Sequence, residues 1–306
     1  MDKEPKIIII LGPTATGKTR VGVRLAKKFN GEIISADSRQ VYIGMDVGTG
    51  KDLREYRVKG QGLKIRYHLI DVVEPTTEFN VAKYQKLAYR AIEDILKRGK
   101  VPIIVGGTGL YINAVVEGFI FKKVRKQENK KARRSLNKLT LKQLLTRLKK
   151  VDSVTYKVID RQNRRRVQRA LEIYYETGQP KSAVVTKQPP PYQFFKIGLN
   201  YPKEILATRI EKRLKERLEK EGMVAEAKRL HQQGLGWKKM AEFGLEYRWL
   251  ANYLQGQISY NEMVVGLAQD SKNFAKRQLT WFKRDQEIVW NNNYKKIEKA
   301  VANFLK

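Results

Sequence analysis

The sequence predicts an α/β protein, in which helices flank a parallel β-sheet and a small helical domain is inserted between two parts of the chain. Short apolar runs alternate with amphipathic helical patterns, which is typical of parallel strands joined by crossover helices. Glycine-rich turns follow two of the apolar runs, and a very basic segment interrupts the alternation at residue 121. We expect residues 1–120 and 188–306 to form the core and residues 121–187 to form the insertion.

The first apolar run, residues 7–11, predicts a buried strand that leads into the loop GPTATGKT. This loop fits the phosphate-binding pattern GxxxxGK(S/T) and precedes a predicted helix at 20–29, which is the context that the pattern requires. Glycines let successive backbone N–H groups face an anion at the positive end of a helix. The alternative is a turn that binds nothing. The residues predicted to bind phosphate are Gly12, Thr14, Ala15, Thr16, Gly17, Lys18 and Thr19.

The composition limits the possible metal sites. The chain has no Cys and only two His residues, His68 and His231, which excludes disulfides and Cys/His metal centres. Any metal must therefore be bound by oxygen, and Mg²⁺ is the simplest choice. The hydroxyl of Thr19 is placed to hold a Mg²⁺ ion that bridges phosphate oxygens. We expect Mg²⁺ as the cofactor.

A second predicted strand, residues 32–36, ends at Asp37. Ligands of open parallel sheets bind beyond the carboxyl ends of the strands, so Asp37 is placed like a site residue. Capping of a following helix is an equally good interpretation. The chain continues with a predicted strand at 67–73 and a helix at 81–97. A strand at 101–105 then leads into a second glycine turn, GGTG, and a helix at 110–116.

The insertion is strongly basic. Residues 122–138 contain nine Lys or Arg and one Glu, and helical patterns follow at 139–150 and 163–176. This density favours a surface that meets a nucleic-acid backbone, although a solvated helical face is the alternative. The whole chain carries a net charge of +32, which also indicates a polyanionic partner.

No run of about 18 apolar residues is present, so we expect no membrane partner. The apolar run at 7–11 is too short for the core of a signal peptide. We expect a monomeric, cytoplasmic protein.

After a returning strand at 194–199, a single long amphipathic helix is predicted at 203–232. Three arginines, Arg209, Arg213 and Arg217, share one face of it at four-residue spacing. If this helix crosses a phosphate site, one or two of them can clamp a pyrophosphate group. A further helix at 267–275 and an aromatic-basic run at 276–284 follow, and we expect the tail at 285–306 to be peripheral.

Seven segments carry a likeness to a known family: GPTATGKT (12–19), ISADS (34–38) with Tyr42, GMDVGT (44–49), HLID (68–71) with Pro75, GGTGLY (106–111), RVQRALE (166–172) and AKRQLTWF (275–282). Over roughly the whole chain to Arg284, they resemble the tRNA dimethylallyltransferases, also called tRNA isopentenyltransferases. The resemblance implies a P-loop NTPase-like sheet, and the absence of a C-terminal Cys/His finger favours a bacterial type.

The resemblance implies transfer of a dimethylallyl group from dimethylallyl diphosphate to N6 of an adenosine next to the anticodon, at tRNA position 37. It implies that Asp37 is the general base and that Lys18, Thr19 and Arg213 stabilise the leaving diphosphate, with Arg209 as the second clamp. Thr108 would line the channel of a flipped-out adenine. The residues implied to contact the anticodon stem-loop are Asp37, Ser38, Arg39, Gln40, Arg165, Arg166 and Arg169.

Three other functions remain open at this point. A small-molecule or nucleotide kinase would use the same loop, but no clear Walker-B Asp follows a long apolar strand. Prenylation of free AMP or ADP is a related possibility, and RNA binding with a steep negative salt slope would argue against it. An RNA-binding protein with a vestigial loop would make the loop, Asp37 and the second glycine turn coincidental.

Overall fold

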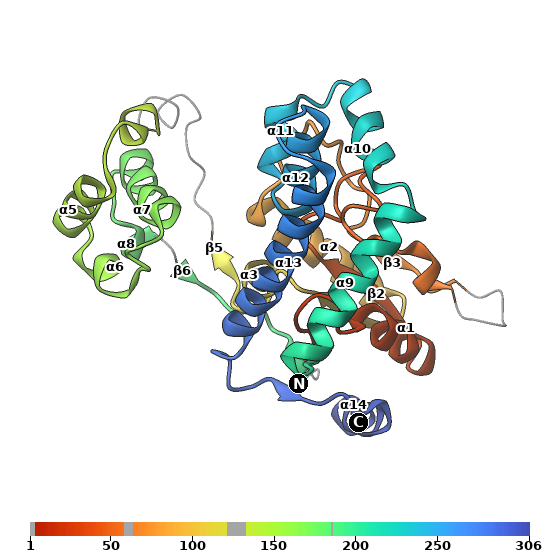
Figure 1. Cartoon of the computed structure of the whole chain (residues 1–306). Helices are drawn as coiled ribbons and strands as arrows, with labels where there is room; N and C mark the ends of the chain where they lie inside the picture. Colours follow the sequence, from red (N-terminus) through yellow and green to blue (C-terminus); the bar gives the residue numbers. More distant parts are fainter. Residues whose placement is uncertain (1–3, 58–63, 121–132, 185) are drawn as a thin grey trace. The chain divides into compact units, whose positions relative to one another are not determined.

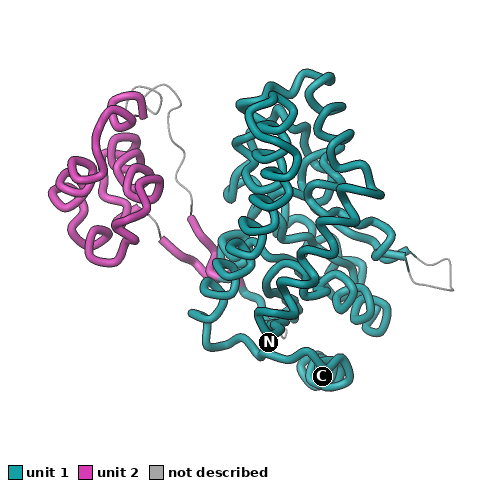
Figure 2. The backbone as a smooth tube through the Cα atoms, in the orientation of Figure 1, with its two compact units in different colours: residues 1–116, 191–306 teal, residues 117–190 magenta. Residues whose placement is uncertain are grey.

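The computed structural model describes residues 4–57, 64–120, 133–184 and 186–306. The chain divides into two compact units, shown in Figure 2. One unit combines Met1–Val116 with Pro191–Lys306, and the other is Glu117–Pro190. Much of the basic segment at 122–138 lies outside the described residues. No helix in the described ranges is long and apolar enough to cross a membrane.

The larger unit is built on a six-stranded sheet with the order β3-β2-β4-β1-β7-β8. Every neighbouring pair of strands is parallel, which agrees with the predicted α/β class. The strands are β1 (Lys6–Leu11), β2 (Gly31–Ala36), β3 (Tyr67–His68), β4 (Val101–Gly106), β7 (Gln193–Gly198) and β8 (Val289–Trp290).

Helices cover both faces of this sheet (Figure 1), because alternate side chains of each strand point to opposite sides. Ile7 and Ile9 of β1 pack with α2 (Val81–Lys97) and α3 (Gly109–Val116). Ile8 and Ile10 pack instead with α1 (Lys18–Lys28) and α14 (Tyr294–Leu305). The continuous apolar run is explained by this burial on both faces.

A helical layer forms a third core with the segment that follows β2. Met45 and Val41 are fully buried against it, as are Met240 and Met263 from the helices. The helices are α9 (Lys203–Glu219), α10 (Met223–Gln232), α11 (Trp237–Glu242), α12 (Leu245–Leu254) and α13 (Tyr260–Phe282). This packing holds the loops beyond β2 against α9, α10 and α12.

The smaller unit has its own core, made by Leu144, Leu148, Val167 and Leu171. A capping box at Thr140 begins its first long helix. Its described elements are β5 (Phe119–Ile120), α5 (Leu141–Val151), α6 (Ser153–Val158), α7 (Arg164–Thr177), α8 (Lys181–Val184) and β6 (Thr186–Lys187), with β5 and β6 antiparallel.

The helix predicted at 267–275 is part of the longer α13, and two other predicted elements are shortened or broken in the structure. The strand expected at 67–73 ends at His68, because Leu69 and Asp71 take positive φ angles of 62° and 55° that a strand does not allow. The single helix expected at 203–232 is two helices, broken at Gly222, whose φ is 75°. Helix α9 ends at Glu219, and the left-handed Gly222 precedes the first residue of α10, so the chain turns between the two helices.

The expectation that the tail at 285–306 is peripheral was wrong. Strand β8 joins the sheet beside β7, and α14 covers part of one face, with Ile297 2% exposed and Val301 fully buried. The hydrophobic face of α14 is as regular as that of α2. The sequence alone does not show that this face packs against the sheet.

Truncation of Ile297 to alanine is therefore expected to lower the free energy of unfolding by about 2–5 kcal/mol. Urea denaturation of the purified protein measures this change. Ile205→Ala is the matched control, because Ile205 is 42% exposed on α9 and its loss should change stability by about 0.5 kcal/mol or less. Equal effects of the two substitutions would contradict the packing described for α14.

Glu32 is a buried carboxylate at the beginning of β2, 1% exposed. It accepts hydrogen bonds from both Nη atoms of Arg98 and from Nζ of Lys100 at 2.9 Å, and His68 Nε2 lies 2.8 Å from it. The Arg98 guanidinium, helped by His68 and Lys100, holds the pKa of Glu32 well below its usual range although burial opposes this.

Because the folded-state pKa is below the unfolded value of about 4.3, Glu32 stabilises the fold above that pH and loses this effect as the pH falls. Glu32→Gln is expected to lower the free energy of unfolding by about 1–3 kcal/mol at pH 7. The difference from the unsubstituted protein should shrink toward pH 3, which urea denaturation across pH measures. A difference independent of pH would contradict this assignment.

Candidate active site

A cavity of about 550 Å³ lies in the larger unit, beyond the carboxyl ends of β1, β2 and β4. The phosphate loop, the turn after β2 and the second glycine turn all contribute to it, together with side chains of α9, α12 and α13. The predicted site residues that line it are Thr14, Ala15, Gly17, Lys18, Thr19, Asp37, Ser38, Arg39, Gln40, Thr108 and Arg213.

The phosphate loop has the backbone expected of an anion nest. The φ angles of Ala15 (63°) and Gly17 (80°) are positive and that of Thr16 between them is not, an alternation that turns N–H groups toward one point. Gly12 (φ 143°) has no room for a side chain, because a Cβ atom would lie 2.2 Å from the Leu199 carbonyl oxygen. The Thr16 hydroxyl donates to the Pro13 carbonyl at 2.9 Å, inside the loop. Gly12 and Thr16 therefore shape the loop from within.

Lys18 folds back over the loop and donates to the Pro13 carbonyl oxygen at 2.6 Å. Burial lowers the pKa of Lys18 to about 8; Asp37 partly offsets this, and Arg213 adds to it. A cation whose charge is this poorly solvated gains more from a bound anion than a surface lysine does. The site thus favours a phosphate group beside Lys18.

Asp37 follows β2, next to the second glycine turn, which follows the neighbouring strand β4. Its Oδ1 accepts hydrogen bonds from the N–H groups of Arg39 at 2.8 Å and Gln40 at 3.4 Å. A turn, and not a helix, follows Asp37. The alternative prediction that Asp37 caps a helix is therefore wrong, although its carboxylate does accept N–H groups of the turn. Thr108 Oγ1 accepts from the N–H of Ser38 at 3.0 Å, which brings Thr108 next to Asp37.

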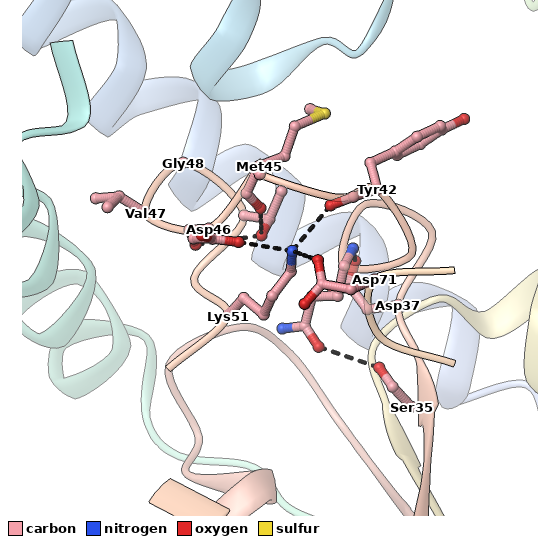
Figure 3. Close-up of polar contacts among 12 residues, drawn as sticks. Ser35, Asp37, Tyr42, Met45, Asp46, Val47, Gly48, Lys51 and Asp71 are labelled. Carbon is pink, nitrogen blue, oxygen red and sulfur yellow. Dashed lines mark hydrogen bonds and ion pairs between the residues drawn. The ribbon is translucent and has the colours of Figure 1, made fainter. Parts of the chain in front are cut away.

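A buried lysine organises the loop after this turn, as Figure 3 shows. The ammonium of Lys51 donates to Asp46 Oδ1 at 2.8 Å, to Asp71 and to the Tyr42 carbonyl oxygen. The Glu226 carboxylate of α10 binds the same loop. It accepts from the successive N–H groups of residues 46, 47 and 48, at 2.8, 2.7 and 3.0 Å. The loop is therefore held in one conformation where it meets the cavity.

The three arginines of α9 differ in their position relative to the cavity. Arg213 lines the cavity and donates from Nη2 to the Gly50 carbonyl oxygen at 3.2 Å. Arg209 does not line it; its guanidinium stacks on Tyr201 and lies 3.5 Å from the Ala15 carbonyl oxygen. Arg217 does line the cavity, near Glu246.

The chain is similar to known proteins over nearly its whole length. A family model described as IPP transferase matches residues 40–285. A tRNA dimethylallyltransferase 1 from Syntrophus aciditrophicus is 44% identical, covering 98% of both chains. The chain belongs to the IPP transferase family. The family match begins after the phosphate loop and Asp37, but the similarity to the Syntrophus protein extends across both.

Solved structures of IPP transferases confirm the predicted fold, a P-loop NTPase-like parallel sheet flanked by helices. The full-length tRNA isopentenylpyrophosphate transferase of Bacillus halodurans has a TM-score of 0.71 at 35% identity, with 99% of this chain and 97% of that one covered. A eukaryotic dimethylallyltransferase acting on tRNA has a TM-score of 0.71 at 28% identity, covering 91% of this chain and 70% of that one.

The predicted RNA-binding arginines of the insertion lie in the smaller unit. Arg165, Arg166 and Arg169 are exposed on α7. Arg169 also pairs with two carboxylates of its own helix, Glu172 at 3.1 Å and Glu176 at 3.2 Å. The other two guanidinium groups are presented to solvent, as a phosphate-binding surface needs.

Sequence reasoning missed Gln278 as a site residue, although it lies in the aromatic-basic motif. Its Oε1 accepts from the Thr14 N–H at 2.9 Å, and its Nε2 donates to the Gly107 carbonyl oxygen at 2.8 Å. Trp281 packs so closely on Gly109 that a Cβ there would lie 2.3 Å from the indole ring. Helix α13 of this IPP transferase family member thereby ties the two glycine turns together.

Proposed function

We propose that this protein transfers the dimethylallyl group of dimethylallyl diphosphate to N6 of the adenosine at tRNA position 37, next to the anticodon, and releases diphosphate. Its family and its relatives named tRNA dimethylallyltransferases support this function. One structural observation supports this reaction. A single cavity holds a phosphate loop, the Asp37 carboxylate, Thr108 and the Arg213 guanidinium.

Asp37 is proposed to act as the general base. The exocyclic N6 is a weak nucleophile, because its lone pair is delocalised into the adenine ring. As the bond from N6 to C1 of the prenyl group forms, the bond from C1 to the diphosphate oxygen breaks. Asp37 accepts the N6 proton, while the N–H groups of Arg39 and Gln40 hold its carboxylate in place.

The leaving diphosphate gathers negative charge as it departs. The N–H groups of the loop, Lys18 and Arg213 are placed to stabilise it. Arg209 supports the loop through Ala15 from outside the cavity. The folded protein already positions these groups around the cavity, so they need little reorganisation during the reaction.

The cavity offers oxygen ligands, which suit Mg²⁺. They are the Thr19 hydroxyl and the Glu55 carboxylate. The described residues contain no cluster of three or more His, Cys, Asp or Glu side chains that could hold a metal alone. Thr19 would thus share the ion with diphosphate and water oxygens, as is usual for Mg²⁺. When bound, the ion would neutralise phosphate charge.

The tRNA is proposed to contact both units. Ser38, Arg39 and Gln40 lie in the turn beside Asp37, where a flipped-out adenosine and its neighbours would approach, and Thr108 would line the adenine channel. Arg165, Arg166 and Arg169 of α7 would bind the backbone of the anticodon stem-loop. The net charge of +32 predicts that binding weakens steeply with salt.

Nucleoside mass analysis tests this function. An unmodified tRNA transcript with adenosine at position 37 is incubated with the protein, Mg²⁺ and dimethylallyl diphosphate, then digested. The target adenosine is expected to gain one C5H8 unit, and a transcript with guanosine at position 37 is the matched control. An unchanged adenosine at saturating substrate would overturn the proposal, and ATP consumption without RNA would instead indicate a kinase.

A further inference from the structure

Arg217 occupies an unusual place for a charged residue, in the middle of the buried face of α9. At 3.6 residues per turn it falls about 20° from Ile210 around the helix axis, whereas Arg213 falls about 60° and Arg209 about 100° away. Ile210 and Leu214 are 6% and 7% exposed, and the Arg217 side chain is 11% exposed. A guanidinium at this position needs a partner to offset its desolvation.

The contacts of Arg217 within the protein provide only part of that compensation. Glu246 Oε1 lies 3.8 Å from Nη1, which is too far for a hydrogen bond. The guanidinium otherwise lies against Gly50, where a Cβ atom would be 1.7 Å from Nη2. Its N–H groups therefore retain donor capacity on the side of the cavity that Arg217 lines.

Arg213 precedes Arg217 by one turn of α9, and both side chains reach the loop at Gly50. A Cβ on Gly50 would also lie 2.7 Å from Nη2 of Arg213, so both guanidinium groups meet at this glycine. Burial, together with the charge of Arg213, lowers the pKa of Arg217 to about 10, and Glu246 only partly opposes this. Two cations held together in this way are stabilised by an anion that lies between them.

We propose that Arg217 binds phosphate oxygens of the diphosphate donor together with Arg213, and that Glu246 positions its guanidinium. This inference rests on the proposed function, because it assigns a further contact in the same site. The diphosphate would then lie in the cavity between Lys18, next to the phosphate loop, and the two α9 arginines, Arg213 and Arg217. Arg217, and not Arg209, is the second arginine of α9 that lines the cavity, and Arg209 acts on the outer side of the loop.

Calorimetric titration with inorganic pyrophosphate in the presence of Mg²⁺ tests the inference on the full chain. Arg217→Met is expected to weaken pyrophosphate binding about 10- to 100-fold, the loss of one or two charge-assisted hydrogen bonds. Its affinity for tRNA should change less than about twofold on this account. Lys212→Met is the matched control, because it removes an exposed charge from the same helix and should leave pyrophosphate binding unchanged.

Unchanged pyrophosphate affinity in Arg217→Met would overturn the inference, and so would a loss confined to tRNA binding, which would assign Arg217 to an RNA phosphate. If the methionine variant does not fold, Arg217→Gln keeps much of the side-chain length and gives the same test. A protein that binds pyrophosphate through Arg217 but leaves adenosine unmodified would sink the proposed function alone. A protein that modifies adenosine with pyrophosphate affinity independent of Arg217 would sink this inference alone.

Discussion

Replacement of Asp37 by asparagine is expected to lower kcat about 100- to 10,000-fold, because an amide cannot accept the N6 proton. Asparagine keeps an oxygen at the Oδ1 position, so the hydrogen bonds from the N–H groups of Arg39 and Gln40 can remain. Single-turnover transfer of labelled dimethylallyl to tRNA, with both substrates saturating, measures the chemical step.

Pyrophosphate and tRNA affinities serve as the control for Asp37→Asn. Both should stay within about threefold of the unsubstituted values, since the carboxylate accepts a proton and does not bind the diphosphate in our proposal. A loss of less than about tenfold in the single-turnover rate would show that another group, or water, takes the proton.

Substitution of Lys18 by methionine is expected to lower kcat/KM for dimethylallyl diphosphate about 100- to 1000-fold. The ammonium donates to the Pro13 carbonyl oxygen of the loop, and its charge is poorly solvated because it is buried. Methionine has a similar length and fills the same space without the charge. Steady-state transfer assays at varied donor concentration and fixed tRNA measure the change.

The pH dependence of pyrophosphate binding checks the role of the Lys18 charge. The pKa of Lys18 is lowered to about 8, so the free protein loses this charge as the pH rises above that value. The difference in pyrophosphate affinity between the unsubstituted protein and Lys18→Met should therefore narrow from pH 7 to pH 9. Comparing the two proteins removes the titration of pyrophosphate itself. A constant difference would show that Lys18 is not the titrating group.

The parts of the fold that sequence could predict are those in which local pattern and tertiary packing agree. Helix α2 was expected at 81–97 and has those bounds, because an Asn80 cap and a regular apolar face fix it locally. The strand at 67–73 and the helix at 203–232 failed where a few residues adopt left-handed backbone. Such local conformations depend on tertiary contacts that composition does not record.

The same distinction holds for the site. The phosphate loop is a contiguous motif, so its residues could be predicted together. Gln278 and Glu226 reach backbone groups far away in the sequence, and no local pattern marks those contacts. Arg217 did carry a signal, because its angular position on the α9 wheel is about 20° from that of the buried Ile210. Four-residue spacing alone grouped it with Arg209, although the two face different surroundings.

The contact between Thr14 and Gln278 spans 264 residues. A ribosome that adds about 5–20 residues per second needs roughly 13–50 s to synthesise that interval. During this time the nascent phosphate loop lacks the side chain that joins it to the second glycine turn. The site is therefore completed only when α13 has left the exit tunnel, so the growing chain cannot assemble its full donor site while most of the protein is still being made.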